Sequence, residues 1–334
     1  MDRLRVGFIG AGGNTRLRHL PGFAAIDGVE LTAVANRSVA SSQGIVAAFG
    51  VGRVARHWRE IIDADDIDAV CIGTWPNTHA EMTCAALKTG KHVLVEARMA
   101  DSLAAAQSMV EAHAAHSELV AQIVPSPMTL EADATITRII AEDKLGMLLE
   151  VRSEFATDAT RDSQAPLSWR MDERISGINT MALGICYEPI QRWLAGDAEV
   201  ATAHAQIITP VRKDTDGSER DVKIPERLSV QGLWGSARLE MSQSSVAEGP
   251  PRCGYQLQGT VGVLNYDVND GRMAISRPDG TVEEINYPKR PEGGWSVESD
   301  FVASIREGIP VTHTDFTTGL RYMKFTDAVW QAWQ

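Results

Sequence analysis

The chain has 334 residues, of which 44% are apolar and 23% charged, a composition typical of a folded globular protein and not of a disordered chain. Its length is sufficient for two domains with a sizeable core. Its formal net charge of -12 argues against nucleic acid or an anionic membrane as a partner, so we expect neither.

The cysteines and the N-terminus bear on the cellular location. The four cysteines are widely scattered and form no Cys-x-x-Cys pair, which favours a reducing compartment over a disulfide framework. The first residues lack the apolar core of a signal peptide. No run approaches the roughly 18 apolar residues of a membrane span. We therefore expect a cytoplasmic protein that is not bound to a membrane.

Short apolar runs alternate with helical stretches over the first third of the chain. The runs are rich in Val, Ile and Leu and predict strands over 5–10, 30–36, 69–74, 92–97 and 119–124. Helices are predicted near 15–25, 39–49, 78–89 and 102–116. Thr78 and Glu81 form a capping box that begins the third of these helices, and Gly90 is suited to end it. This alternation predicts a parallel, doubly wound sheet with right-handed crossovers.

The pattern changes after about residue 125. A helix is predicted over 130–143, followed by a long strand over 147–158. Further strand-forming runs occupy 201–210, 227–245, 254–268 and 272–288, and a last helix is predicted near 315–333. The pair Asp279-Gly280 between two alternating runs is a hairpin turn signal. This part therefore predicts a mostly antiparallel sheet with a few helices.

A glycine-rich loop follows the first predicted strand. The segment GAGGNT opens the next helix, and glycines at such a point let the backbone turn tightly and approach a pyrophosphate at the helix N-terminus. Threonine replaces the third glycine of the Gly-x-Gly-x-x-Gly pattern, and a glycine-rich turn without function is the alternative. The expected cofactor contacts here are Gly10, Gly12, Gly13, Asn14 and Thr15.

The end of the second predicted strand bears on which nucleotide binds. NAD-preferring folds place an acid there to accept hydrogen bonds from the adenosine ribose. This sequence has Asn36, Arg37 and Ser38 instead, and Arg37 can bind a 2′-phosphate and stack on adenine. We therefore expect NADP as the cofactor, with NAD possible. The alternative is that Arg37 is a surface residue that opens the next helix.

Several longer segments carry a family resemblance: GTWPNTHAEMTCAAL, GKHVLVEARMA, LSWRMDERISG and RWL. With these, the chain resembles the Gfo/Idh/MocA oxidoreductases, such as glucose-fructose oxidoreductase and inositol dehydrogenase, over nearly its whole length. The resemblance implies an NAD(P)-binding Rossmann domain over 1–124. It implies a substrate-binding and oligomerisation α/β domain with a large open antiparallel sheet over 125–334. It also implies a homodimer or homotetramer.

Several positions match the family's cofactor motifs. Thr74, Pro76 and His79 match a Thr-x-Pro-x-x-His segment that lines the cofactor after the fourth strand. Trp75, inside this segment, joins the expected cofactor contacts, although its position also suits stacking on a ring-shaped substrate. Glu96 matches the glutamate of a Glu-Lys-Pro motif near the nicotinamide ribose.

The motifs of the substrate side match less completely. Trp169 and Arg170 match a Trp-Arg pair that precedes the substrate-domain motif, and we expect them to bind substrate. The family's Glu-Lys-Pro reads Glu96-Ala97-Arg98 here, without the lysine. Its Asp-x-Gly-x-His reads residues 182–186, without the aspartate and the histidine, when Arg192-Trp193-Leu194 fixes the register. In the family the lysine and histidine hold the substrate hydroxyl and move its proton, so the proton-transfer apparatus departs from the family's.

Three residues are candidates for chemistry at these altered positions. Arg98 stays protonated and is a poor base, but it suits stabilising an anion or anchoring an anionic substrate; a salt bridge to a neighbouring acid explains it equally well. Cys186 stands at the histidine position, where a thiol near a cation can ionise, yet a small core residue is the more common role. Tyr187 or Glu188 can relay a proton or cap a helix, and Pro189 suits that helix's first turn.

Together these patterns predict an NADP-dependent oxidoreductase. It would transfer hydride between nicotinamide and a small sugar-, polyol- or cyclic-type carbonyl or alcohol, with Arg98 in place of the usual lysine. Two other functions keep the nucleotide: a lyase or hydrolase that recycles bound cofactor, and a non-catalytic sensor or scaffold. The sequence offers no set of metal ligands, so we expect no metal.

Overall fold

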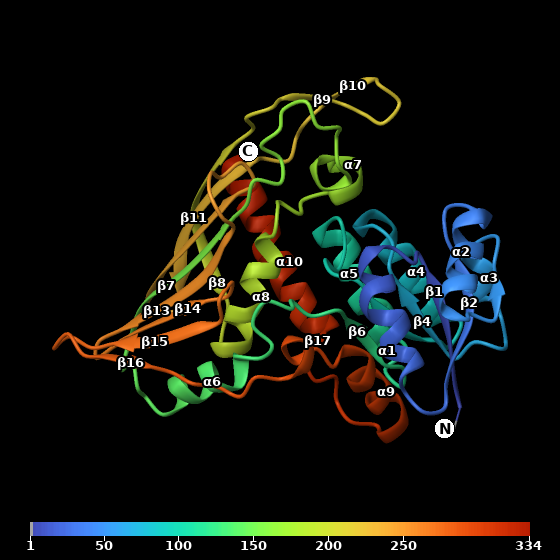
Figure 1. The fold of residues 1–334 in the computed structure, drawn as a ribbon, viewed down its shortest axis with the longest axis horizontal. Coiled ribbons are helices and arrows are strands. Elements are labelled where there is room, and N and C mark those ends of the chain that lie inside the picture. The colour runs from blue at the N-terminus through green and yellow to red at the C-terminus, as the bar shows by residue number, and fades with distance from the viewer. Residues whose placement is uncertain (1–2) are drawn as a thin grey trace. The chain divides into compact units, whose positions relative to one another are not determined.

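The computed structural model describes residues 3–334, and their contacts divide the chain into two units (Figure 1). The first unit extends to Pro125 and also includes Ser296–Leu320. The second unit contains Ser126–Trp295 and Arg321–Gln334. We keep a domain boundary near residue 124 as our proposal. The predicted second domain, 125–334, differs from the second unit because residues 296–320 belong to the first unit.

The first unit is built on one sheet with the strand order β17-β6-β5-β4-β1-β2-β3. All neighbours pair in parallel except β17, which is antiparallel to β6. The strands are β1 Leu4–Ile9, β2 Val29–Ala35, β3 Arg53–Val54, β4 Ala69–Ile72, β5 His92–Val95, β6 Ala121–Ile123 and β17 Thr314–Asp315. The order 3-2-1-4-5-6 is that of the doubly wound dinucleotide-binding fold. The predicted parallel sheet is thus confirmed.

Helices connect these strands. They are α1 Leu20–Ala24, α2 Val39–Phe49, α3 Arg59–Ile62, α4 Pro76–Lys88, α5 Leu103–Ala114 and α9 Val297–Glu307. The capping box predicted at Thr78 is wrong, because α4 already begins at Pro76 and Trp75 is its N-cap. Proline suits the first helical position since its missing N–H needs no partner there. Phe23 of α1 packs edge-on between Phe8 of β1 and Phe301 of α9, which joins the late helix to this core.

The helix predicted over 15–25 begins with a wider turn. Thr15–His19 is a π-helix, in which the N–H of Leu20 donates to the carbonyl of Thr15, five residues back. Such a turn contains one more residue than an α-helical turn and is frequent at functional sites. Leu17 is 70% exposed on its outer side, whereas His19 is completely buried. The turn therefore directs His19 toward the interior of the first unit.

The second unit contains an open sheet with the strand order β16-β15-β14-β13-β7-β12-β11-β8 (Figure 1). Only β7 and β12 pair in parallel; every other neighbouring pair in this sheet is antiparallel. Its strands are β7 Leu148–Ala156, β8 Ala198–Gln206, β11 Arg227–Trp234, β12 Ala237–Ser244, β13 Arg252–Gly259, β14 Val263–Asp267, β15 Arg272–Ser276 and β16 Val282–Glu284. The predicted antiparallel sheet is confirmed.

The Asp279-Gly280 turn is present between β15 and β16. Gly280 has φ +87°, a conformation that favours glycine, and Arg277 N–H donates to the carbonyl of Thr281 across the turn. A separate hairpin pairs β9 Val211–Lys213 with β10 Glu219–Asp221. In residues 3–334, no helix is both long enough and apolar enough to cross a membrane.

The second unit also contains helices. They are α6 Asp133–Ala141, α7 Glu173–Ser176, α8 Leu183–Trp193 and α10 Phe316–Trp333, with short 3₁₀ turns at Trp169–Met171 and Pro291–Gly294. The first residues of α10, up to Leu320, belong to the first unit and the rest to the second. Pro189 lies inside α8, so its predicted place in a first turn is wrong. The helix begins six residues earlier, at Leu183.

Candidate cofactor-binding site

The glycine loop lies at the carboxyl end of β1. Gly10 has φ +82°, and a Cβ atom there would lie 2.6 Å from Thr74 Cγ2 and 2.9 Å from the backbone of Gly73. A Cβ atom on Gly13 would meet nothing within 4 Å. Gly10 is therefore needed for the close approach of two loops, whereas the open space at Gly13 fits the phosphate group that such a loop binds.

Thr15, which replaces the third glycine of the motif, is buried against Gly73. Its hydroxyl donates to the carbonyl of Gly10 at 3.3 Å. A Cβ atom on Gly73 would lie 2.1 Å from Thr15 Oγ1 and 2.4 Å from the carbonyl oxygen of Gly10. The bulk of the threonine is accommodated because residue 73, after β4, has no side chain. A glycine in the neighbouring loop thus fulfils the packing role of the missing one.

We expect Gly73→Ala to weaken cofactor binding by at least about tenfold, because the added methyl group must displace the glycine loop. The free energy of unfolding should fall by about 1–3 kcal/mol through overpacking. Isothermal titration with NADPH and urea unfolding measure the two effects. Gly44→Ala in α2 is the control, since its Cβ atom would meet nothing within 4 Å and alanine favours a helix. Unchanged binding in Gly73→Ala would contradict the packing argument.

The three residues after β2 have different roles. Asn36 Oδ1 accepts a hydrogen bond from Ala11 N–H at 2.7 Å and so ties the glycine loop to β2. Ser38 is the N-cap of α2. Arg37 is exposed, and its guanidinium carbon lies 4.7 Å from the centre of the Trp75 ring. The structure therefore brings together Arg37 and Trp75, predicted from different motifs, as a stacked cationic surface beside the glycine loop.

The Thr-x-Pro-x-x-His segment begins α4. The ring of His79 is completely buried, with Nε2 3.2 Å from the carbonyl of Thr74 and Nδ1 3.0 Å from the carbonyl of Arg98. Burial lowers the pKa of His79, so its ring is neutral near pH 7. His79 thus connects the loop after β4 with the loop after β5. The Arg98 side chain is itself buried, and the Ala97–Arg98 peptide bond is cis.

Glu96, after β5, is the centre of a hydrogen-bond network. Its Oε1 accepts from Asn14 Nδ2 at 2.6 Å and contacts His19 Nε2 at 3.0 Å, and its Oε2 accepts from Ala97 N–H at 3.2 Å. The other ring nitrogen of His19 lies 2.5 Å from Glu298 Oε1. Neither His19 nor Glu298 was expected from the sequence.

This network is charged. Burial alone lowers the pKa of His19, but hydrogen bonds to Glu298 and Glu96 outweigh it and raise the pKa to about 9. Burial raises the pKa of Glu96, but the hydrogen bonds from His19 and Asn14 outweigh burial and lower the pKa. At neutral pH the site therefore contains an imidazolium and an ionised Glu96 at the edge of the glycine loop.

Cys186 and Tyr187 lie in the core of the second unit. Cys186 is completely buried, and its thiol lies 4.0 Å from Met128 Sδ. Tyr187 stacks on Phe325 of α10 with ring centres 3.8 Å apart, and its hydroxyl accepts from Ala198 N–H at 2.9 Å. Burial raises the pKa of Tyr187. These surroundings favour packing over proton transfer for both residues.

Trp169 and Arg170 follow a loop whose backbone is hydrogen-bonded to a buried ion pair. The Arg170 guanidinium carbon lies 4.3 Å from the centre of the Trp169 ring. In the preceding loop, the carbonyl of Asp162 accepts from Arg212 Nη1 at 2.6 Å. Arg212 pairs with Glu226 at 3.0 Å, and both side chains are 1% exposed. The pair fixes the chain that leads to the Trp-Arg motif.

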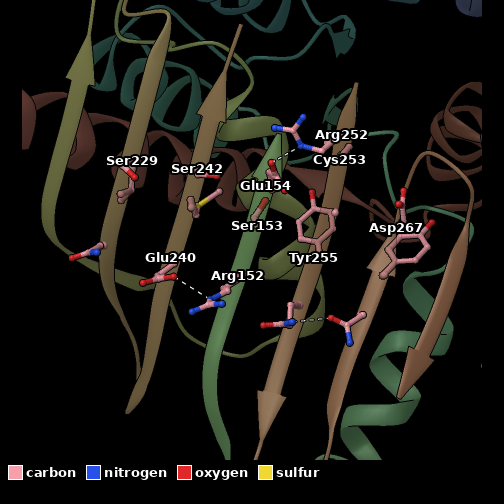
Figure 2. Close-up of a pocket in the computed structure, with 17 residues that line it drawn as sticks. Arg152, Ser153, Glu154, Ser229, Glu240, Ser242, Arg252, Cys253, Tyr255 and Asp267 are labelled. Carbon is pink, nitrogen blue, oxygen red and sulfur yellow. Dashed lines mark hydrogen bonds and ion pairs between the residues drawn. The ribbon is translucent and has the colours of Figure 1, made fainter. Parts of the chain in front are cut away.

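The open sheet of the second unit carries a hollow of about 590 Å³ (Figure 2). None of the site residues predicted from the sequence lines it. Figure 2 shows Arg152 directed at Glu240, 3.0 Å away, and Arg252 directed at Glu154, 2.8 Å away. Four of its charged side chains are thus paired between neighbouring strands. Within residues 3–334, no group of three or more His, Cys, Asp or Glu side chains is arranged to hold a metal ion.

Comparisons with known proteins agree with these features. Residues 4–123 match the model of an oxidoreductase family with an NAD-binding Rossmann fold, Gfo/Idh/MocA. A dTDP-3,4-didehydro-2,6-dideoxy-alpha-D-glucose 3-reductase of Streptomyces antibioticus is 30% identical over 92% of this chain and 90% of its own length. A levoglucosan dehydrogenase of Pseudarthrobacter phenanthrenivorans is 28% identical over 64% of this chain, which spans 56% of that relative's length.

The fold as a whole also has solved counterparts. A levoglucosan dehydrogenase in complex with NADH and L-sorbose superimposes with a TM-score of 0.87. The match covers 99% of this chain and 96% of that one, at 21% identity. This similarity supports the two-part α/β architecture over the full length of the chain.

Proposed function

Because this chain belongs to the Gfo/Idh/MocA oxidoreductase family, we propose that it is an NADP-dependent oxidoreductase acting on a small sugar-, polyol- or cyclic-type carbonyl or alcohol. The observation that carries the proposal is the charged network at the glycine loop, where Asn14 and ionised Glu96 meet. The relatives named for levoglucosan and for a dideoxyglucose derivative support a sugar-like substrate.

The residues present fit a nicotinamide dinucleotide. The glycine loop leaves open space at Gly13 for phosphate, and Arg37 and Trp75 offer a stacking surface at the end of β2. Glu96 offers a carboxylate to ribose hydroxyls. The bound cofactor would supply or accept the hydride, and the protein's residues would bind and orient it.

The preference for NADP rests on Arg37. The end of β2 offers a cationic side chain in place of the acid that favours NAD. A charge-assisted hydrogen bond to a 2′-phosphate contributes about 1.5–3 kcal/mol, which corresponds to roughly a 10- to 100-fold preference.

We expect calorimetric titration to give a Kd at least about tenfold lower for NADPH than for NADH. Arg37→Gln should weaken the binding of NADPH by about tenfold more than that of NADH, which removes this preference. Arg59→Gln is a matched control, because Arg59 also lies over a tryptophan, Trp58, at 4.2 Å on the same unit. Equal binding of both nucleotides would contradict the role of Arg37. Binding of neither would contradict the proposed function as a whole.

For the chemistry we retain Arg98. Its guanidinium stays protonated, so it suits stabilising negative charge that develops on a carbonyl oxygen, or anchoring an anionic substrate, and not accepting a proton. Trp169 and Arg170 are proposed to contact the substrate, as the family resemblance implies. We further propose a cytoplasmic homodimer or homotetramer, in keeping with four free cysteines and the open sheet of the second unit.

A further inference from the structure

His19 lies between two carboxylates that come from distant parts of the sequence. Nε2 faces Glu96 at the end of β5, and Nδ1 faces Glu298 in the first turn of α9. The side chains of His19 and Glu298 are 0% and 5% exposed. A Cβ atom on Gly22 would lie 2.8 Å from the Glu298 carboxylate, so α1 has a glycine where this carboxylate passes. The arrangement therefore depends on the π-turn, on a glycine in α1 and on α9 together.

The geometry, together with the acidic nature of both partners, favours a doubly protonated ring. A neutral imidazole donates through one nitrogen only, whereas here both nitrogens face carboxylate oxygens. Asn14 Nδ2 and His19 Nε2 lie 3.4 Å apart because both are directed at Glu96 Oε1. The pKa of His19, raised to about 9 by the two carboxylates against the effect of burial, agrees with this assignment.

The two oxygens of Glu96 are not used equally. Each carboxylate oxygen can accept about two hydrogen bonds. Oε1 accepts from Asn14 and His19 and is saturated, whereas Oε2 accepts only the 3.2 Å bond from Ala97 N–H among the hydrogen bonds described. The Glu96 side chain is 15% exposed, unlike those of His19 and Glu298. One acceptor position of an otherwise fixed carboxylate thus remains for a ligand hydroxyl.

We propose that His19 is a positioning residue, which Glu298 holds as an imidazolium and which in turn fixes ionised Glu96 to accept a hydrogen bond from a cofactor ribose hydroxyl. The inference rests on the proposed function, because it assigns a task within that cofactor site. His19 and Glu298 would touch neither cofactor nor substrate and would act through Glu96.

Further titratable groups face this network within the first unit. The thiol of Cys71 on β4 is buried, and burial with the charges of Glu96 and Glu298 raises its pKa, so it stays uncharged. His79 of α4 is neutral near pH 7, since burial lowers its pKa. Between pH 6 and 9.5, His19 is therefore the member of this group whose charge changes.

The test compares His19→Gln and Glu298→Gln with the wild type by measuring the Kd of NADPH and NADH from pH 6 to 9.5. His57→Gln is the control, because His57 is an exposed histidine of the same unit. We expect wild-type binding to weaken by about tenfold as the pH rises through about 9. His19→Gln should bind about tenfold more weakly than the wild type at pH 6, and this difference should shrink as the pH rises through about 9.

Glu298→Gln keeps the shape of the side chain and removes its charge. We expect it to move the midpoint of the binding transition, and the His19 titration followed by NMR, down by at least one pH unit. If His19 and Glu298 had only a structural role, both substitutions would lower the Tm but leave the Kd of NADPH and the pH midpoint of binding unchanged. That result would overturn the inference. A wild-type protein that binds neither nucleotide would instead overturn the proposed function, and the inference with it.

Discussion

Replacing Arg212 by methionine is expected to lower the free energy of unfolding by about 3–5 kcal/mol, because it leaves the carboxylate of Glu226 buried without its counterion. Arg212 also donates to the carbonyl groups of Asp162 and Ala165 at 2.6 and 3.1 Å. These loop carbonyls lose Arg212 as a donor in the variant. The loop before Trp169 should therefore become more mobile, in addition to the loss of stability.

Urea unfolding of Arg212→Met and Arg252→Met makes this prediction specific. Arg252 pairs with Glu154 at a similar distance, 2.8 Å, but both side chains are 49% exposed. Exposed ion pairs contribute about 0–1 kcal/mol, so Arg252→Met should change stability little. The double variant Arg212→Met/Glu226→Met should be more stable than Arg212→Met alone, because no unpaired charge remains. Equal losses for Arg212→Met and Arg252→Met would contradict the argument from burial.

The stability of the protein is expected to fall as the pH rises from about 6.5 to about 9. The pKa of His19 is raised from 6.5 to about 9 in the folded state, so the folded protein holds this proton more tightly than the unfolded chain. The stabilisation is fully present below pH 6.5, declines as the pH rises toward 9 and is lost above it. A difference of about 2.5 pH units corresponds to about 3 kcal/mol.

Urea unfolding at pH 6, 7.5 and 9 measures this slope. Glu298→Gln should reduce it, because the carboxylate that raises the pKa of His19 is gone. Glu96 has the opposite effect on the pH dependence of stability, and at acidic pH. Its pKa is lowered, so its contribution to stability is lost only as the pH falls through that lowered value. A wild-type protein as stable at pH 9 as at pH 6 would show that His19 is not held as an imidazolium.

Elements with local signals at their ends were predictable from the sequence. The helix predicted over 39–49 agrees with α2, whose ends carry such signals: Ser38 caps the first turn and Gly50, with φ +70°, ends the helix. The two-residue strands β3 and β17 are too short to show a period and were not predicted. At α4 the helix begins at Pro76, two residues before the predicted start at Thr78.

The residues of the candidate site were predictable only where they belong to short, continuous sequence motifs. The glycine loop and the residues after β2 belong to short motifs, and the structure brings these parts together. His19 and Glu298 are 279 residues apart, and the inward direction of His19 depends on a π-turn that hydrophobic periodicity does not reveal. The enclosure of Cys186 and Tyr187 likewise depends on partners such as Met128 and Phe325 in distant parts of the sequence.

The return of Ser296–Leu320 to the first unit has a consequence for biosynthesis. When the ribosome has delivered the first 125 residues, β6 still lacks its partner β17, and Glu298 has not yet been translated. An unpaired strand edge is a site of mispairing with other chains, and multidomain chains are prone to it while they emerge. The nascent first unit must therefore wait, with this edge open, until residues 296–320 have been synthesised.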